Sequence, residues 1–209
     1  DEIFLLREAA PGTRPAIRGR DLSAWRAEPR VHLIWTHGPD GRVLARLPLE
    51  LECLMEQHVG RLHRRSDYRR GPPWQLFRVG LASAPYRVVW PDLARRLLAA
   101  VPAPAAVPLN TVYGIATRTL NDAYALAALL NSRWTSALAS LHADPARGGF
   151  RRFNAGVVRD LPVPSPESPA WALLTDWGRR SVVDDDAIPA IYELDRADRR
   201  ALARLAPDL

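Results

Sequence analysis

The sequence contains no lysine: all 29 of its strongly basic side chains are arginine. The chain therefore cannot supply the lysine of a phosphate-binding P-loop, a Schiff-base lysine or the lysine of the usual Mg²⁺-dependent nuclease motif. Arginine carries a planar guanidinium whose parallel donors suit phosphates and the edge of guanine. A GC-rich genome also replaces lysine by arginine, so the composition permits nucleic-acid binding without demonstrating it.

Cysteine and long apolar runs are also scarce. The single Cys53 excludes a disulfide framework and a cysteine-based zinc site. No apolar run approaches the roughly 20 residues that span a bilayer, and the first residues lack the pattern of a signal peptide. We therefore expect a cytoplasmic protein with no membrane partner. Since residue 1 is Asp rather than Met, we also expect the chain to be a piece of a longer protein.

The length of 209 residues and the 47% hydrophobic content fit one large domain or two small ones. Local patterns predict both strands and helices. Apolar residues at helical spacing run from Leu51 to Leu62 behind Pro48, which suits a first helical turn. A second helical block, 121–142, begins at a cap formed by Thr119 or Asn121 and is divided at Asn131–Ser132. The remaining predictions are strands at 31–35, 42–47, 86–90 and 110–119, and helices around 171–177, 188–194 and 196–205.

The segment Gly71-Pro-Pro-Trp74 is close to a catalytic motif without matching it. DNA amino-methyltransferases carry Asp or Asn before Pro-Pro-aromatic, and that side chain accepts a hydrogen bond from the amino group of the flipped base. Gly71 has no side chain for this contact, and no glycine-rich cofactor loop precedes it. We expect a proline turn here.

Other catalytic and metal-binding patterns are also missing from the sequence. His58 and His63 are five residues apart, which places them on different helical faces, and no Asp or Glu stands at ligand spacing from a histidine. No Gly-x-Ser-x-Gly nucleophile elbow occurs. We expect this chain not to be an enzyme and to hold no cofactor or metal itself.

Two arginine clusters remain as candidates for function. The first lies between Arg61 and Arg70 and is followed by Trp74; the second extends from Arg147 to Asn154 on a glycine-rich segment. Arginines interleaved with aromatic residues are typical of surfaces that follow a nucleic-acid backbone. A solvated charged face is the alternative reading of each cluster.

Four segments in one order point to a family. They are Asn110-Thr-Val-Tyr-Gly-Ile115, the block from Asn121 to Ser132, Gly148-Gly-Phe-Arg-Arg152 and Leu161-Pro-Val-Pro164. This order resembles the C-terminal specificity domain of Taq-type, gamma-class N6-adenine DNA methyltransferases, including those fused to restriction nucleases. The resemblance covers nearly the whole chain. The apolar spacing of 94–101 fits either a strand or a helix, and in that family this segment is a strand.

The resemblance implies an α+β fold with a mixed, largely antiparallel sheet and packed helices. Residues 1–164 would form the target recognition domain, and 165–209 a helical extension packing on it. Double-stranded DNA is the implied partner. Adenine methylation, with S-adenosylmethionine as methyl donor, would belong to a separate catalytic domain of the parent chain.

On this reading, arginines of the recognition domain contact phosphates, while side chains on its loops read bases. The candidates for phosphate contacts are Arg64, Arg65, Arg69, Arg70 and Arg147. The candidates for base or groove contacts are Arg18, Arg20, Trp74, Arg151, Arg152 and Asn154. The alternative function is a protein-interaction module whose arginine surfaces dock an acidic partner or a sister subunit.

Overall fold

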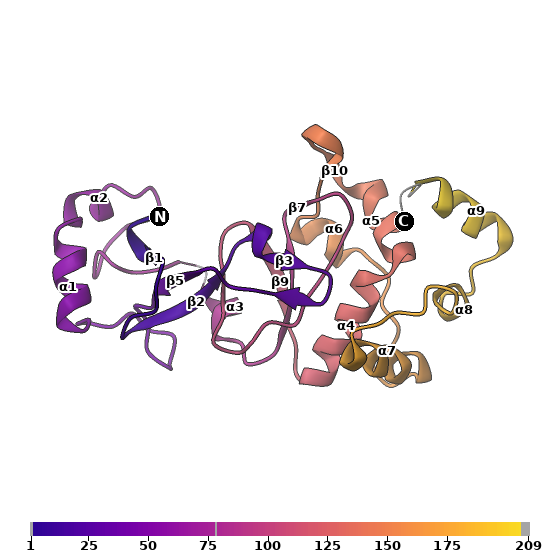
Figure 1. The fold of residues 1–209 in the computed structure, drawn as a ribbon, viewed down its shortest axis with the longest axis horizontal. Helices are drawn as coiled ribbons and strands as arrows, with labels where there is room; N and C mark the ends of the chain where they lie inside the picture. Colours follow the sequence, from indigo (N-terminus) through magenta and orange to yellow (C-terminus); the bar gives the residue numbers. More distant parts are fainter. Residues whose placement is uncertain (1, 78, 206–209) are drawn as a thin grey trace.

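The computed structural model describes residues 2–77 and 79–205 and has an α+β fold (Figure 1). The molecule is elongated: the N-terminal strands and α1 lie at one end, and the C-terminal helices lie at the other (Figure 1). The expected α+β class is therefore confirmed.

In the described part of the chain, the strands form four small sheets rather than one large one. Their orders are β1-β5-β2-β8, β10-β11-β7, β3-β4 and β6-β9. Pairing is antiparallel except between β2 and β8, which are parallel. The strands are β1 (Leu5–Leu6), β2 (Thr13–Ile17), β3 (Leu22–Ser23), β4 (Arg26–Ala27), β5 (Val31–Ile34), β6 (Arg87–Pro91), β7 (Leu93–Ala94), β8 (Val107–Pro108), β9 (Val112–Ala116), β10 (Asp144–Pro145) and β11 (Arg151–Arg152).

Helices dominate the second half of the chain. The α-helices are α1 (Leu49–Glu56), α2 (Val59–His63), α3 (Gly80–Ser83), α4 (Leu120–Asn131), α5 (Arg133–His142), α6 (Ala155–Arg159), α7 (Pro169–Arg180), α8 (Ile188–Ile191) and α9 (Arg196–Leu205). Short 3₁₀ turns are η1 (Glu2–Phe4), η2 (Gly19–Asp21) and η3 (Arg147–Gly149).

Local capping determines where α4 and α5 begin. Thr119 accepts a hydrogen bond from Asp122 N at 3.1 Å, and the Asp122 carboxylate accepts one from Thr119 N at 3.1 Å. Ser132 caps α5 by accepting from Trp134 N at 3.1 Å. The predicted cap and the predicted division of the helical block are thus confirmed.

Two local expectations are wrong. The helix expected after Pro48 is broken into α1 and α2, because His58 between them has a non-helical backbone with φ −112° and ψ 8°. The strand expected at 42–47 does not form; Val43 makes an isolated bridge to His37 instead. The segment 94–101 is strand in part, since β7 covers its first residue and Ala100 bridges Val89.

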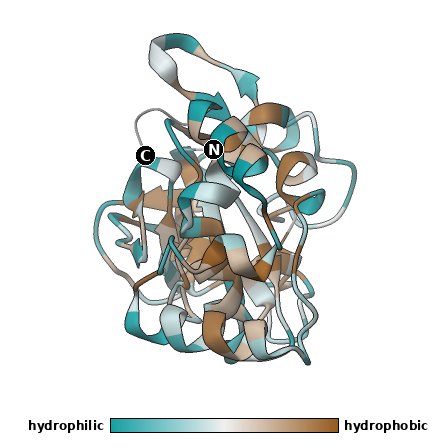
Figure 2. Ribbon diagram, turned by 90° about the vertical axis from the view of Figure 1, so that its right-hand side faces the viewer, coloured by the Kyte–Doolittle hydropathy of each residue, from teal (hydrophilic) through white to brown (hydrophobic). Residues whose placement is uncertain are grey.

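The apolar interior is divided into clusters that follow the length of the molecule. One surrounds Ile34, Met55 and Leu62 at the N-terminal end. A central cluster contains Trp90 and Phe153, and the Trp90 indole donates to the Phe153 carbonyl at 2.7 Å. This bond connects β6 to the chain just after β11. Figure 2 shows hydrophobic segments gathered inside the body.

The C-terminal helices pack on α4 and α5. Trp171, Leu174 and Trp177 of α7 are buried with residues of α4, and α9 lies against α5. Helices α7 and α4 approach closely at Gly178, where an added Cβ would lie 2.0 Å from the Tyr124 carbonyl oxygen of α4. Residues 206–209 of the predicted extension lie outside the described chain.

Two arginines are used to build the fold. Arg87 is 1% exposed and donates to the carbonyls of Ala84, Ala103, Pro104 and Ala106. Arg14 donates to the carbonyls of Ala105 and Pro104, in the proline-rich loop before β8 that also accepts from Arg87. Burial, followed by the nearby charge of Arg14, lowers the pKa of Arg87 to about 10. These guanidiniums hold a loop in place and are not available to a ligand.

We predict that buried His37 makes stability depend on pH. His37 is 5% exposed, and burial lowers its pKa below the ordinary value of 6.5. The unfolded chain therefore takes up this proton at a higher pH than the folded chain, so the free energy of unfolding should fall as the pH drops from about 7 to about 5. Denaturant unfolding should show a shallower dependence for His37→Gln and the wild-type dependence for His142→Gln, a change at an exposed position. If the free energy of unfolding depended on pH equally in all three proteins, His37 would not be the source of the dependence.

Candidate nucleic-acid interface

A groove of about 750 Å³ lies between the η2 turn and the β10-β11-β7 sheet. Its basic lining consists of Arg18, Arg20 and Arg95, and Phe150 contributes an aromatic side chain. The acidic side chains in the lining are Glu2 and Asp92. We take this groove as the starting point of the candidate interface.

Backbone contacts fix the η2 side of the groove. Gly19 N donates to the Thr111 hydroxyl at 2.9 Å, and Arg18 N donates to the Asp21 carboxylate at 2.9 Å. A Cβ at Gly19 would lie 2.9 Å from the Thr111 carbonyl oxygen, so this close approach requires glycine. The turn is therefore held against the start of β9, and Arg18 and Arg20 line the groove.

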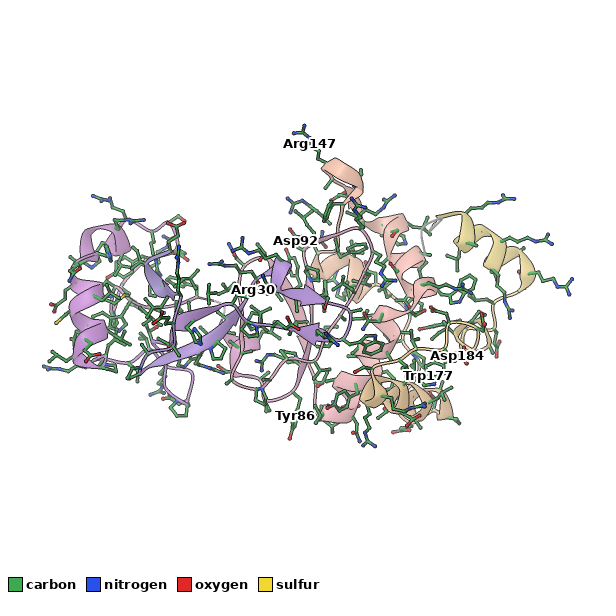
Figure 3. The ribbon with its side chains drawn as sticks, viewed as in Figure 1. Arg30, Tyr86, Asp92, Arg147, Trp177 and Asp184 are labelled. Atoms are coloured by element: carbon green, nitrogen blue, oxygen red, sulfur yellow. The ribbon has the colours of Figure 1, made fainter. Side chains whose placement is uncertain are left out.

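The other side of the groove carries a projecting hairpin, residues 144–152, which we call the arm. Gly148 and Gly149 have φ values of 75° and 77°, and Ala146 N donates to the Phe150 carbonyl at 2.7 Å, so the chain reverses tightly. The arm projects from the body and is largely hydrophilic (Figures 1 and 2). Arg147 at its tip points away from the molecule (Figure 3).

The charges of the groove are unevenly compensated. The side chains of Arg18, Arg20, Arg95 and Arg147 make no hydrogen bond or ion pair with any part of the chain that the structure describes. The Arg95 guanidinium lies 5.7 Å from the Phe150 ring centroid, a cation–π distance. Asp92 instead forms an ion pair with Arg152, at 2.6 Å. Positive charge therefore remains available to an anion along this face.

Adjacent Arg151 and Arg152 point to opposite sides of β11. Arg151 turns back to the carbonyls of Ser140 and Ala143 at 3.1 and 3.4 Å, at the end of α5. Arg152 faces outward and its side chain is 52% exposed. Alternation along a strand explains the difference. Arg151 thus anchors the arm and is withdrawn as a base-contact candidate, whereas Arg152 stays accessible.

The Arg61–Arg70 cluster lies in and after α2, at the N-terminal end of the molecule (Figure 1). Arg64 and Arg70 are exposed, and Arg69 is exposed while donating to the Ser66 carbonyl at 2.8 Å. Arg65 differs: its guanidinium lies 5.2 Å from the Phe4 ring and 5.0 Å from the Phe77 ring, and its side chain is 15% exposed. Arg65 is therefore a packing residue rather than a phosphate contact.

Trp74 and Asn154 also have structural positions. Trp74 is 9% exposed in the N-terminal core, and its indole donates to the Leu44 carbonyl at 2.9 Å. Asn154 caps α6 by accepting from Gly156 N at 2.9 Å and Val157 N at 3.2 Å. Trp74 is buried and is therefore withdrawn as a base contact. Asn154 is half-buried and only its Oδ1 is engaged in the cap, so its assignment as a base contact stays a prediction.

The structure adds Arg95 and Phe150 to the candidates. Phe150 stood beside the predicted arginines in sequence, but Arg95 lies in a segment whose apolar spacing fits either a strand or a helix. Because the type of element was ambiguous, the sequence did not show on which side the Arg95 side chain would lie. Pairing of β7 with β11 places Arg95 next to the arm.

Within residues 2–77 and 79–205, no group of three or more His, Cys, Asp and Glu side chains is placed to hold a metal ion. None of the helices in these ranges has both the length and the apolar character needed to cross a bilayer. A scan against family models finds no match to the chain, and a search of curated proteins finds none either.

Proposed function

We propose that this chain binds double-stranded DNA in a sequence-specific manner, as the target recognition domain of an N6-adenine DNA methyltransferase or restriction-modification enzyme. The observation that carries the proposal is the groove lined by Arg18, Arg20 and Arg95, whose charges have no described partner, beside an arm tipped by Arg147. The order of sequence segments from Asn110 to Pro164 supports the assignment to this class.

The two parts of the interface have different tasks in this proposal. The unpaired arginines neutralise phosphates and release condensed counterions, which supplies affinity for any duplex. The arm is hydrophilic and lies along the duplex with Arg147 at its tip on the phosphates, so that its base faces the major groove, where base edges can be read. Sequence preference then comes from side chains near the base of the arm.

The proposal assigns only recognition to this chain. Adenine methylation, with S-adenosylmethionine as methyl donor, belongs to a catalytic domain of the parent protein. Gly71 supports this division, because the methyltransferase motif requires Asp or Asn at the position that Gly71 occupies before Pro-Pro-Trp.

A salt titration tests the proposal. Binding of the chain to a fluorescent duplex, followed by anisotropy, should weaken linearly on a log–log plot as salt rises. Arg18 and Arg20, predicted from the sequence as groove or base contacts, are assigned to phosphates here because their side chains have no partner in the described chain. Together with Arg95 and Arg147 they predict a slope of about −4 at about −0.9 per contact, and contacts from the exposed Arg64, Arg69 and Arg70 would make it steeper. No binding at about 50 mM salt would contradict the proposal. Equal binding to duplex DNA and to an acidic polypeptide, without sequence preference, would favour the protein-interaction alternative.

A further inference from the structure

Arg152 and Asp92 form an ion pair at the edge of the groove. Nη1 of Arg152 lies 2.6 Å from Oδ2 of Asp92; the Arg152 side chain is 52% exposed and the Asp92 side chain 16%. The Asp92 backbone is held on both sides, because its N donates to the Thr111 carbonyl at 3.0 Å and its carbonyl accepts from Phe153 N at 2.8 Å. A fixed carboxylate thus orients a half-exposed guanidinium at the base of the arm.

The ion pair leaves one edge of the guanidinium unused. Arginine has five N–H donors, and this contact occupies Nη1. The Nε and Nη2 atoms have no hydrogen-bond partner in the described chain. Those two atoms present parallel donors, the arrangement that binds two adjacent acceptors at once.

The charges around Arg152 discriminate between possible ligands. Asp144 lies directly opposite Arg152 in the β10–β11 ladder, so the two side chains share one side of the sheet. With Asp92 and Asp144 nearby, the positive charge of Arg152 is offset, and a phosphate would meet two carboxylates. An uncharged base edge meets no such repulsion. Among residues 2–77 and 79–205, Arg18, Arg20, Arg95 and Arg147 have no such ion pairs, so they suit phosphates better.

From these contacts we propose that Arg152 reads a guanine in the DNA major groove and that Asp92 is the positioning residue that orients its guanidinium. Guanine offers adjacent O6 and N7 acceptors, which match the free Nε–Nη2 edge. This inference rests on the proposed function and deepens it, because it names a base and the residue pair that selects it.

Selection from a random duplex library tests the proposal with the full chain. The wild-type motif should contain a G·C pair at one position, where Arg152→Ala lowers the preference for guanine by roughly 10- to 100-fold and leaves the other positions unchanged. Arg152→Lys keeps the charge but loses the parallel donors, so it should keep overall affinity and lose the same preference. Arg147→Ala is the matched control on the same arm: it should weaken binding to all sequences alike and retain the motif.

Asp92→Asn tests whether the Asp92 carboxylate orients the Arg152 guanidinium or only contributes to the local packing. It removes a negative charge, so overall affinity should hold or rise, while the preference for guanine at the Arg152 position falls. Thermal unfolding of each variant by circular dichroism checks folding, and Arg152→Lys still decides the role of Arg152 if Asp92→Asn does not fold. A folded Asp92→Asn that keeps the wild-type preference for guanine would overturn the positioning role of Asp92. An unchanged motif in Arg152→Ala and Arg152→Lys, with wild-type DNA binding intact, would overturn this inference alone. Failure of the wild-type chain to bind DNA would overturn the proposed function with it.

Discussion

Replacing Arg18, Arg20 and Arg95 together by alanine is expected to lower the affinity of the chain for duplex DNA by about 10²- to 10³-fold at about 0.1 M salt. Each arginine lines the groove and has no partner in the described chain. By counterion release, each lost phosphate contact costs about tenfold near this salt concentration and reduces the slope of the salt dependence by about 0.9. The slope should therefore become shallower by about 3. Anisotropy titrations at several salt concentrations measure both quantities.

A control variant with the same change in net charge separates the groove from general electrostatics. Arg42, Arg159 and Arg180 are surface arginines that pair with Asp40, Asp160 and Asp176. Replacing these three by alanine also removes three positive charges, and surface ion pairs contribute at most about 1 kcal/mol each to stability. We expect this control to retain most of the wild-type affinity. An equal loss in both triple variants would show that net charge, rather than the groove, attracts DNA.

The features predicted correctly from sequence are those fixed by neighbouring residues. Thr119 and Asp122 satisfy each other's backbone groups within one helical turn, and Ser132 does the same for α5. Such caps depend on spacing along the chain, so the sequence alone indicates them. The α+β class follows from the same local patterns.

The roles of individual arginines depend on contacts that spacing does not determine. Arg65 is held against Phe4, which lies far away in sequence, so its neighbours on the chain gave no sign of burial. Arg151 and Arg152 are identical side chains, and only the pairing of β11 with β7 decides which one faces outward. Arg95 became a candidate for the same reason. Clustering in the sequence pointed to part of the candidate interface, but strand pairing decides which of these arginines face outward.

Gly178→Ala is expected to destabilise the packing of α7 on α4 by about 3 kcal/mol or more. The new Cβ would lie 2.0 Å from the Tyr124 carbonyl oxygen and 2.5 Å from the carbonyl carbon. Because the obstacle is backbone, no side-chain rotation relieves it. Overpacking typically costs about 1–3 kcal/mol and occasionally more, so this contact should fall at the upper end. Separation of the helices would also expose Trp171 and Trp177, which are buried in the contact. Denaturant unfolding followed by tryptophan fluorescence should detect the loss.

Gly60→Ala is the matched control, since a Cβ at Gly60 in α2 has no neighbour within 4 Å. Alanine is favoured over glycine in a helix by about 1 kcal/mol, so this variant should be as stable as the wild type or more so. The same preference acts at Gly178, so a net loss there isolates the helix contact. Wild-type stability of Gly178→Ala would mean that the α4–α7 crossing adjusts without cost.

The DNA affinity of Gly178→Ala then tests whether 165–209 is a separable extension. One face of α4, with Ala127 and Leu130, belongs to the central cluster that supports β6 and the arm, whereas Leu129 packs toward α7. If the central cluster holds α4 by itself, the groove stays intact and affinity remains within about threefold of the wild type, a difference of less than 1 kcal/mol. If affinity falls in proportion to stability, α4 needs α7 to keep its place, and the recognition domain must include the C-terminal helices.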